Sequence, residues 1–405
     1  MIPTSDGRLS LPRGAPHAGL GHKELSLSEL LENARPLAEQ LAREGVTVID
    51  ADFHSREEPD WSEILGYLDN DVWEHLLRTS GGGRLWIPGG PASGRVQEIG
   101  ERMRAATAWR EARDADPGAE GHNLRLAEVL DAIGISRVLL FPQHILNLGS
   151  NPFPELEVQI ARAHARWLTE RVLASDPRFL SSLFLPLSDP EACLKLVEDF
   201  GDEPGVVGFT ITSSRYEALH TSGYLPIFAA MEERGLALVF HSSFSYREPS
   251  MRMFNRFLSL HAMGFPHFNM VHATNWIVNG LPERFPDLKL MFVEGGLAWI
   301  PFLMQRLDHT VMMRPSEAPL LTRLPSDYMR DFYYTTQPME ATNIRELQAT
   351  LEFINANDRL LYASDFPHWD WDPPSRIWDL PFLSDEDRRA ILGDNAERLF
   401  GFAQS

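Results

Sequence analysis

Eight short apolar segments separated by helical patterns predict an α/β protein whose parallel strands close into a single (β/α)₈ (TIM) barrel. The expected strands are rich in Val, Ile, Leu and Phe and cover residues 46–52, 137–142, 180–187, 205–212, 236–243, 288–294, 331–336 and 359–364. Helical patterns lie between strands, for example at 154–175, 190–200, 222–234 and 341–354. A doubly wound open sheet is the alternative arrangement of the same elements.

The barrel is expected to span residues 46–405, with residues 1–45 as an N-terminal extension. The first 25 residues are rich in Gly, Pro and polar side chains, which indicates an extended arm. A helix at about 27–44 follows this arm. Ser26 and Glu29 form a capping box at its start, and Pro36 is placed to kink it.

Two long insertions are expected in the barrel, at 53–136 after the first strand and at 244–285 after the fifth. The first contains a glycine-rich stretch, residues 80–94. It is either a mobile lid over an active site or a plain surface excursion. It is no phosphate loop, because no Gly-Lys-Ser/Thr follows it and no strand precedes it.

Composition restricts the class of protein. The chain has 37 basic and 57 acidic side chains and a formal charge of −20, which argues against a nucleic-acid partner. The single cysteine, Cys193, cannot form an internal disulfide, which fits a reducing cytoplasm. We find neither a secretory leader nor an apolar run of about 18 residues, so we expect a cytoplasmic protein without a membrane span.

Five residues of metal-ligating type lie on or at the ends of the expected strands. Asp52 and His54 stand two residues apart after an apolar run, so in a strand they would point to one side. His241, Glu294 and Asp365 each close another apolar segment. The carboxyl ends of barrel strands face one mouth, and a charge buried there must have a partner. The pattern predicts convergence on a metal ion; separate ion pairs are the alternative.

Other polar residues follow the same strands. His368 lies three residues beyond the last expected ligand, where it would bind the metal, hold a ligand or contact substrate. His144 follows the second strand and is a second candidate for proton transfer at the mouth. Glu57 and Glu58 are expected in a solvated loop. We expect His272 to be a helix histidine with its hydrogen bonds satisfied.

Aromatic residues are frequent near the expected ligands, and a pocket that they line would suit a bulky apolar substrate. Core or loop packing is the alternative for each of them. The residues are Phe53, Phe244, Tyr246, Trp276, Trp299, Phe366, Trp369 and Trp371.

Four stretches together resemble the amidohydrolase-related (amidohydrolase 2) barrel family, which includes metal-dependent aromatic decarboxylases. They are IDADFH (49–54), PERFPDLKLMFVEGGLAWIPFLMQRLDH (282–309), YASDFPHWDWDPP (362–374) and ILGDNAERLFGF (391–402). The chain departs from the family pattern at Asp52, where His or Glu is usual, and at Glu294, where His is usual. The stretch 205–212 also lacks the bridging Lys or Glu that many members use between two metals.

The resulting carboxylate-rich set is similar to a branch that contains a nonheme diiron monooxygenase of platensimycin and platencin biosynthesis. This resemblance implies two iron ions held by Asp52, His54, His241, Glu294 and Asp365, with His368 as a further ligand or a donor to one. It also implies an electron donor and a bulky apolar substrate, such as a diterpenoid linked to coenzyme A. Relatives of this kind are often dimers or larger, so we expect a homo-oligomer.

We therefore favour a diiron monooxygenase at this point. The alternative is a decarboxylase or hydrolase with one divalent ion, Zn or Mn, in which His368 or His144 moves the proton. A third interpretation, a barrel that has lost catalysis and serves as a binding protein, is disfavoured by the intact set of ligand-type residues.

Overall fold

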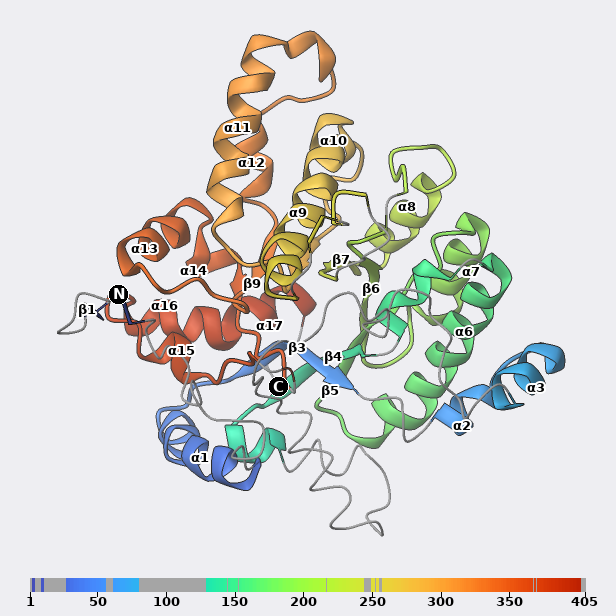
Figure 1. Ribbon diagram of the computed structural model, residues 1–405, viewed down its shortest axis with the longest axis horizontal. Helices are drawn as coiled ribbons and strands as arrows, with labels where there is room; N and C mark the ends of the chain where they lie inside the picture. Colours follow the sequence, from blue (N-terminus) through green and yellow to red (C-terminus); the bar gives the residue numbers. More distant parts are fainter. Residues whose placement is uncertain are drawn as a thin grey trace.

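The computed structural model describes residues 2–3, 9–10, 27–55, 61–79, 129–143, 145–151, 153–215, 217–243, 249–251, 253–254, 257–366, 368 and 370–401. Within these residues, eight parallel strands form one sheet in the order β10-β9-β8-β7-β6-β5-β4-β3, with helices around the outside (Figure 1). The strands are β3 (Ile49–Ser55), β4 (Arg137–Pro142), β5 (Phe179–Phe184), β6 (Val206–Thr212), β7 (Ala237–His241), β8 (Leu290–Val293), β9 (Tyr333–Thr335) and β10 (Leu360–Leu361). A separate antiparallel pair joins β1 (Ile2–Pro3) to β2 (Leu9–Ser10).

The first and last barrel strands meet and close the sheet. The Ala51 amide donates to the Tyr362 carbonyl at 2.8 Å, and the His54 amide donates to the Phe366 carbonyl at 2.8 Å. The predicted (β/α)₈ barrel is therefore confirmed, and the open-sheet alternative is wrong. The chain between β3 and β4 and the chain between β7 and β8 are long, as expected for insertions after the first and fifth strands.

Several predicted strand boundaries are wrong, and two of them bear on the site. The first strand runs on to Ser55, so Asp52 and His54 lie inside β3 and not at its end. The pairing of β3 with β4 shifts register between Asp50 and Phe53. The last strand is only Leu360–Leu361, because the backbone then leaves the regular ladder. The last strand ends early because the backbone that follows it hydrogen-bonds to β3. The apolar pattern of the sequence does not encode such a contact.

The helices agree closely with the apolar periodicity. The predicted helix at 190–200 matches α7 (Pro190–Phe200), and that at 154–175 is α6 (Pro154–Trp167) continued by η3 (Leu168–Val172) and η4 (Leu173–Ser175). The other helices are α1 (Leu27–Arg43), α2 (Trp61–Leu65), α3 (Asp71–Thr79), η2 (Ile145–Ser150), α8 (Leu225–Glu233), α9 (Phe257–Val278), α10 (Leu281–Arg284), α11 (Trp299–Met313), η5 (Pro315–Glu317), α12 (Pro325–Met329), α13 (Ile344–Phe353), α14 (Ala356–Arg359), α15 (Ser375–Trp378), α16 (Asp385–Arg389), η6 (Ala390–Asp394) and α17 (Asn395–Phe400).

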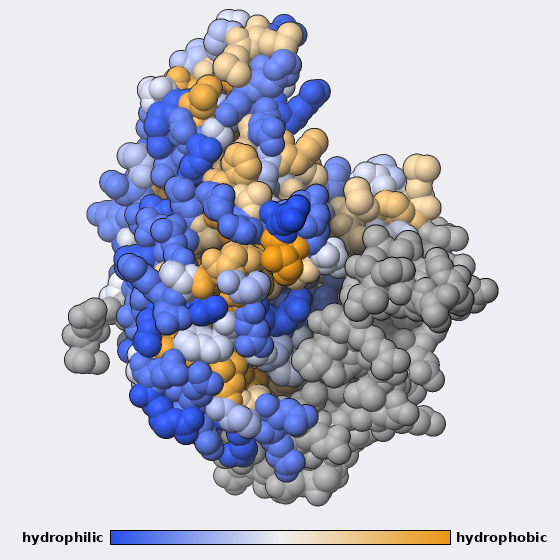
Figure 2. Space-filling view, turned by 90° about the vertical axis from the view of Figure 1, so that its left-hand side faces the viewer, coloured by the Kyte–Doolittle hydropathy of each residue, from blue (hydrophilic) through white to orange (hydrophobic). Residues whose placement is uncertain are grey.

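The hydrophobic core has two shells, as expected for a barrel wrapped in helices. Inward-facing residues such as Leu139, Phe141 and Val239 fill the barrel. A larger shell between strands and helices includes Cys193, which is fully buried and packs as an apolar residue. The surface shown in Figure 2 is largely hydrophilic, with apolar side chains in separate patches. Among the described helices, none has the length and apolar character needed to cross a bilayer.

Several predictions from the sequence concern residues that lie outside the described part of the chain. They are the Ser26 cap, Glu57 and Glu58, the glycine-rich stretch 80–94, His144, Phe244, Tyr246 and Trp369. They stay predictions.

Candidate metal centre

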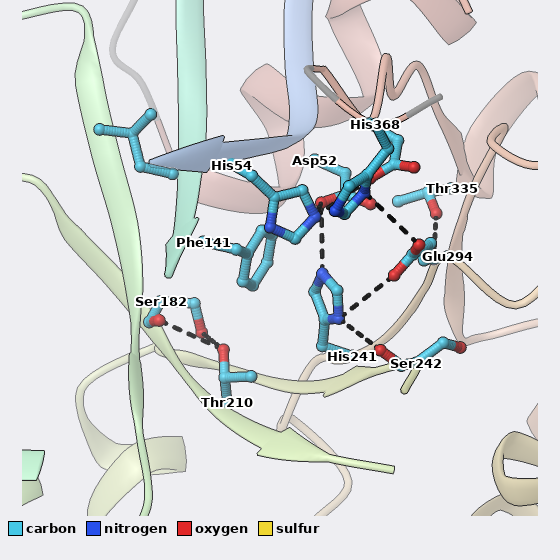
Figure 3. A network of polar contacts seen from close by, with 12 residues as sticks. Asp52, His54, Phe141, Ser182, Thr210, His241, Ser242, Glu294, Thr335 and His368 are labelled. Carbon is cyan, nitrogen blue, oxygen red and sulfur yellow. Dashed lines mark hydrogen bonds and ion pairs between the residues drawn. The ribbon is translucent and has the colours of Figure 1, made fainter. Parts of the chain in front are cut away.

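The predicted ligand-type residues meet at the mouth of the barrel (Figure 3). Asp52 and His54 come from β3, His241 closes β7, and Glu294 directly follows β8. One ligand atom from each of these four lies within 4.8 Å of the others. Asp365 follows β10 and is fully buried. The structure therefore brings together residues from four separate strands, as the sequence predicts.

The first group centres on the Asp52 carboxylate. Its Oδ1 lies 3.3 Å from His241 Nε2 and 3.5 Å from His54 Nε2. On the other side of the ring, His241 Nδ1 lies 3.6 Å from Glu294 Oε2. Each of these four residues is at least nine-tenths buried, so the charges interact with little screening by water.

A second group overlaps the first and consists of His54, Asp365 and His368. Asp365 Oδ1 lies 3.0 Å from His54 Nε2 and 2.5 Å from His368 Nδ1. His368 Nδ1 also lies 3.8 Å from Glu294 Oε1, so the Glu294 carboxylate faces both groups. His368 therefore lies beside the other ligand-type residues, and its role there stays a prediction.

The backbone at two of these carboxylates is unusual. Glu294 has φ 58° and Asp365 has φ 57°, in the left-handed region that glycine favours. Such a conformation costs a residue with a side chain on the order of 1–3 kcal/mol. Hydrogen bonds hold both: the Glu294 amide donates to Thr335 Oγ1 at 3.1 Å, and the Asp365 amide donates to the Asp52 carbonyl at 2.8 Å. Strain retained at both positions is typical of functional residues.

Burial and mutual repulsion shift the acid–base equilibria of the cluster. Burial raises the pKa of Glu294 well above its usual range, and repulsion from Asp52 adds to it. Burial also raises the pKa of Asp365 well above its usual range, and repulsion from Glu294 and then Asp52 adds to the shift. Burial lowers the pKa of His54, and the neighbouring histidines lower it further. Without a cation, burial therefore favours the neutral forms of Glu294, Asp365 and His54.

Just below the ligands, Asp50 is fully buried on β3. Burial raises its pKa to about 7, although its Oδ1 accepts hydrogen bonds from the amides of Ser364 and Asp52. These bonds tie the first strand to the residue that precedes Asp365. Asp50 therefore stabilises the contact between the first and last barrel strands, which positions His54, Asp365 and His368.

The donor set fits a divalent cation. Asp52 Oδ2, Asp365 Oδ2 and His54 Nδ1 are buried and lack hydrogen-bond partners in the described part of the chain. Buried polar atoms are rarely left in this state, and coordination to a cation would satisfy them. Mixed carboxylate and imidazole ligands suit Mn, Fe or Zn.

A backbone contact orients the His241 ring. His241 Nδ1 lies 2.8 Å from the Ser242 carbonyl oxygen, so the proton on Nδ1 is donated to that oxygen. The lone pair on Nε2 then points toward Asp52 and the centre of the first group. This arrangement, a ring nitrogen fixed by a carbonyl while the other binds metal, is usual for histidine ligands.

The aromatic residues predicted to line an apolar pocket lie elsewhere. The five described ones belong to the hydrophobic core: Phe53, Trp276, Trp299, Phe366 and Trp371. They pack on one another or on other core rings. For these five, core packing is the correct interpretation, and the pocket-lining hypothesis is wrong.

Phe141, which the sequence analysis did not single out, is the ring beside the ligands. Its centroid lies 4.7 Å from that of His241 and 6.5 Å from that of His54. The alternation of inward-facing residues from Leu139 could have identified it. Three further polar neighbours, Ser242, Asn269 and Thr335, give no signal in the sequence pattern. His272 is the satisfied helix histidine expected, with Nε2 2.9 Å from the Ser213 carbonyl.

A family model described as amidohydrolase (Amidohydro_2) matches residues 148–402, more than half of the chain. The chain belongs to the amidohydrolase family. With its buried group of ligand-type side chains, this amidohydrolase is a metal-dependent enzyme. The family resemblance expected from the four sequence stretches is confirmed.

Named relatives of this amidohydrolase are decarboxylases. A gamma-resorcylate decarboxylase of Rhizobium radiobacter is 25% identical over 284 residues, covering 67% of this chain and 85% of the relative. The corresponding enzyme of Rhodococcus jostii is 25% identical over 308 residues, covering 70% and 92%. The comparison therefore favours the decarboxylase alternative over the monooxygenase.

Solved structures show the same fold. A dihydroxybenzoic acid decarboxylase of a Polaromonas species, with bound manganese and the inhibitor 2-nitroresorcinol, has a TM-score of 0.62 and 20% identity, covering 89% of this chain and 98% of that one. A 5-carboxyvanillate decarboxylase of Novosphingobium aromaticivorans, complexed with manganese, has a TM-score of 0.61 and 18% identity, covering 88% and 96%. The barrel architecture is thus shared over nearly the whole of those chains.

Proposed function

We propose that this amidohydrolase is a divalent-metal-dependent decarboxylase of small aromatic carboxylic acids. The observation that carries the proposal is the convergence of buried Asp52, His54, His241 and Glu294 at the barrel mouth, with the buried Asp365 in contact with His54. The similarity to gamma-resorcylate decarboxylases over two thirds of the chain supports this reaction class. Manganese in the two solved decarboxylases supports a divalent ion of that kind.

Those four residues and Asp365 would hold the ion. When bound, a divalent cation supplies Lewis-acid chemistry by polarising a substrate oxygen. The protein side chains orient this site: the Ser242 carbonyl fixes the His241 ring, and Asp365 contacts both His54 and His368. The buried position excludes bulk water from the ligands.

Decarboxylation requires a proton at the ring. The bond between the ring carbon and the carboxyl carbon breaks, CO₂ leaves, and the electron pair that stays on the ring carbon takes up a proton. We assign its delivery to His368, because Asp365 Oδ1 lies 2.5 Å from His368 Nδ1 and a quarter of the His368 side chain is exposed. His144, outside the described residues, stays a second candidate for this role.

One observation favours a second function, the nonheme diiron monooxygenase. The two ligand groups share His54, and Glu294 faces both His241 and His368. Three buried carboxylates, Asp52, Glu294 and Asp365, suit two dications as well as one. This function would require iron, dioxygen, an electron donor and an apolar substrate, for which a coenzyme A-linked diterpenoid is the proposal.

The deciding experiment measures metal content and product together. The protein is purified without oxygen, its metals are counted per chain by mass spectrometry, and the manganese-loaded form is given 2,6-dihydroxybenzoate or 5-carboxyvanillate. We expect one manganese or zinc per chain and release of CO₂. Two irons per chain, oxygen consumption and no CO₂ from these acids would overturn the decarboxylase proposal in favour of the monooxygenase.

A further inference from the structure

Helix α9 brings one polar side chain, Asn269, against the two loops that carry His241 and Glu294. Asn269 is fully buried, and its Nδ2 donates to Ser242 Oγ at 3.0 Å. The same Nδ2 lies 2.3 Å from the point where a Cβ on Gly295 would stand. Ser242 directly follows His241, and Gly295 directly follows Glu294. One side chain therefore contacts the residue after each of two ligands.

The contact with Ser242 leads to the His241 ring. The Ser242 carbonyl accepts the hydrogen bond from His241 Nδ1 at 2.8 Å, as Figure 3 shows. The Ser242 amide donates to the Val293 carbonyl at 3.0 Å, at the end of β8. A shift of Ser242 would thus turn the imidazole and change the direction of its Nε2 lone pair.

The contact with Gly295 leads to the Glu294 carboxylate. The chain turns sharply there, with φ 58° at Glu294 and φ 71° at Gly296. Glycine at 295 leaves the space that the Asn269 amide fills. The amide therefore packs against the turn from outside, where it limits the movement of the strained Glu294 backbone.

The rest of α9 fixes Asn269 in this position. His272, one turn later, reaches the Ser213 carbonyl at 2.9 Å after β6. The Ser213 amide in turn donates to the His241 carbonyl at 2.8 Å. Trp276, another turn on, packs against Phe228 with ring centroids 5.0 Å apart. One face of the helix is thus bonded to the ends of successive barrel strands.

The Asn269 amide is poorly explained by core packing alone. Its Oδ1 is buried and has no hydrogen-bond partner among the described residues. A buried amide with an unpaired oxygen is less stabilising than an apolar side chain of similar size. A role in the geometry of the adjacent loops accounts for the amide at this position.

We propose that Asn269 is a positioning residue that sets the separation and orientation of His241 and Glu294, and so the affinity of the centre for a divalent cation. The inference rests on the metal centre of the proposed function. Groups that hydrogen-bond to metal ligands, or to their neighbours, commonly change metal affinity by about 10–100-fold. The same magnitude is expected for Asn269.

The test is a manganese titration of the full-length, metal-stripped protein, followed by the EPR signal of free Mn²⁺. Asn269→Ala should weaken manganese binding about 10–100-fold and change the spectrum of the bound ion. Its melting temperature without metal should stay within a few degrees of the wild type. Asn275→Ala is the matched control, because Asn275 is an exposed residue of the same type on the same helix. It should change neither quantity.

Ser242→Ala removes the hydroxyl oxygen that accepts the hydrogen bond from Asn269. Like Asn269→Ala, it should lower the affinity for manganese. If the two residues act through one contact, the double variant should bind no more weakly than the weaker single variant. Manganese affinity within twofold of the wild type in Asn269→Ala would overturn the inference. If Asn269→Ala does not fold, wild-type affinity in Ser242→Ala would overturn it. A wild-type protein that binds manganese but releases no CO₂ contradicts only the proposed reaction.

Discussion

Asp365 is the carboxylate of the second ligand group and contacts His54, the residue that the two groups share. It is fully buried, contacts His54 and His368, and has a left-handed backbone held by the Asp52 carbonyl. A carboxylate in that position is unfavourable without a compensating positive charge. Its charge, and not its shape alone, is therefore expected to matter for metal binding.

Asp365→Asn keeps the shape of this side chain and removes its charge. We expect manganese affinity to fall by at least about 100-fold, the upper end for groups that only support ligands, and turnover to fall with it. Titration with manganese and measurement of CO₂ release give both quantities. Asp379→Asn, an exposed replacement of the same kind, should leave them unchanged. Normal metal affinity in Asp365→Asn would exclude Asp365 as a ligand.

His272 makes the stability of the fold depend on pH, and it belongs to neither ligand group. Burial lowers its pKa to about 4, from an ordinary value near 6.5, although contacts with the Ser213 and Arg215 backbone oppose the shift. The unfolded chain therefore binds a proton between pH 6.5 and 4 that the folded chain does not. Stability from this residue is fully present above pH 6.5 and is lost as pH falls through that window.

His272→Gln should remove this acid-dependent loss. The difference in unfolding free energy between pH 7 and pH 4.5 should be smaller in the variant than in the wild type, by at most about 3 kcal/mol. Urea unfolding at both pH values measures it. Equal pH dependence in the two proteins would contradict the assignment.

The turn after β8 shows how an element positions a residue. Gly296 has φ 71°, and a Cβ there would lie 2.4 Å from Glu340 Oε1. Glu340 Oε2 accepts the Leu297 amide at 2.9 Å, close to the start of α11. The acidic side chain therefore stabilises the beginning of the helix and holds the turn that presents Glu294.

Gly296→Ala should disturb this turn in two ways, through its backbone angle and through Glu340. Gly235→Ala is the matched control, because φ there is 68° and nothing lies within 4 Å of the added Cβ. We expect the control to cost about 1 kcal/mol of unfolding free energy and Gly296→Ala to cost more. Only Gly296→Ala should also weaken manganese binding. Equal effects of the two variants would argue against a role for Glu340.

A substitution at the start of helix α16 should change the stability of the fold without changing the metal centre. Ser384 and Asp387 form a capping box at its start, with the Asp387 amide donating to Ser384 Oγ at 3.0 Å. Ser384→Ala should lower the unfolding free energy by about 1 kcal/mol. Its manganese affinity should equal that of the wild type, which thermal unfolding and titration together test. A parallel loss of affinity would show that general destabilisation alone weakens the centre.

At the scale of the whole molecule, the buried carboxylates link metal, pH and stability. Burial raises the pKa of Glu294 and Asp365, so folding without a cation favours their protonated forms. The sign of the effect follows: stability of the metal-free protein is lost as pH rises above the ordinary carboxyl range. A bound cation removes that loss, because it favours the ionised forms.

Manganese should therefore raise the melting temperature more at pH 7.5 than at pH 5.5. At a free concentration of about 100 times Kd the added stability is about 2.7 kcal/mol. Differential scanning calorimetry with and without manganese, and with EDTA as the control, measures the change at each pH. A larger increase at pH 5.5 would contradict the sign derived from the buried carboxylates. The homo-oligomer and the cytoplasmic location expected from the sequence stay predictions.

Much of the candidate site could be predicted because barrel topology converts sequence order into spatial position. His241, Glu294 and Asp365 close apolar runs that are far apart in the chain. The carboxyl ends of parallel strands meet at one mouth, so a ligand-type residue at each end is sufficient to predict convergence. No such rule predicts the positions of the aromatic side chains. A ring near a strand end packs inward or outward according to its neighbours, and Phe141 rather than Phe53 faces the ligands.

The sequence by itself determined the barrel, several of its helices and the strands that carry the ligands. These depend on local apolar periodicity, which each segment contains in its own residues. Only the tertiary structure decided that Asp52 and His54 lie inside the first strand, that Glu294 faces both ligand groups, and that Asn269 contacts two ligand loops. Those contacts join residues far apart in the chain, and their geometry depends on how whole elements pack against one another.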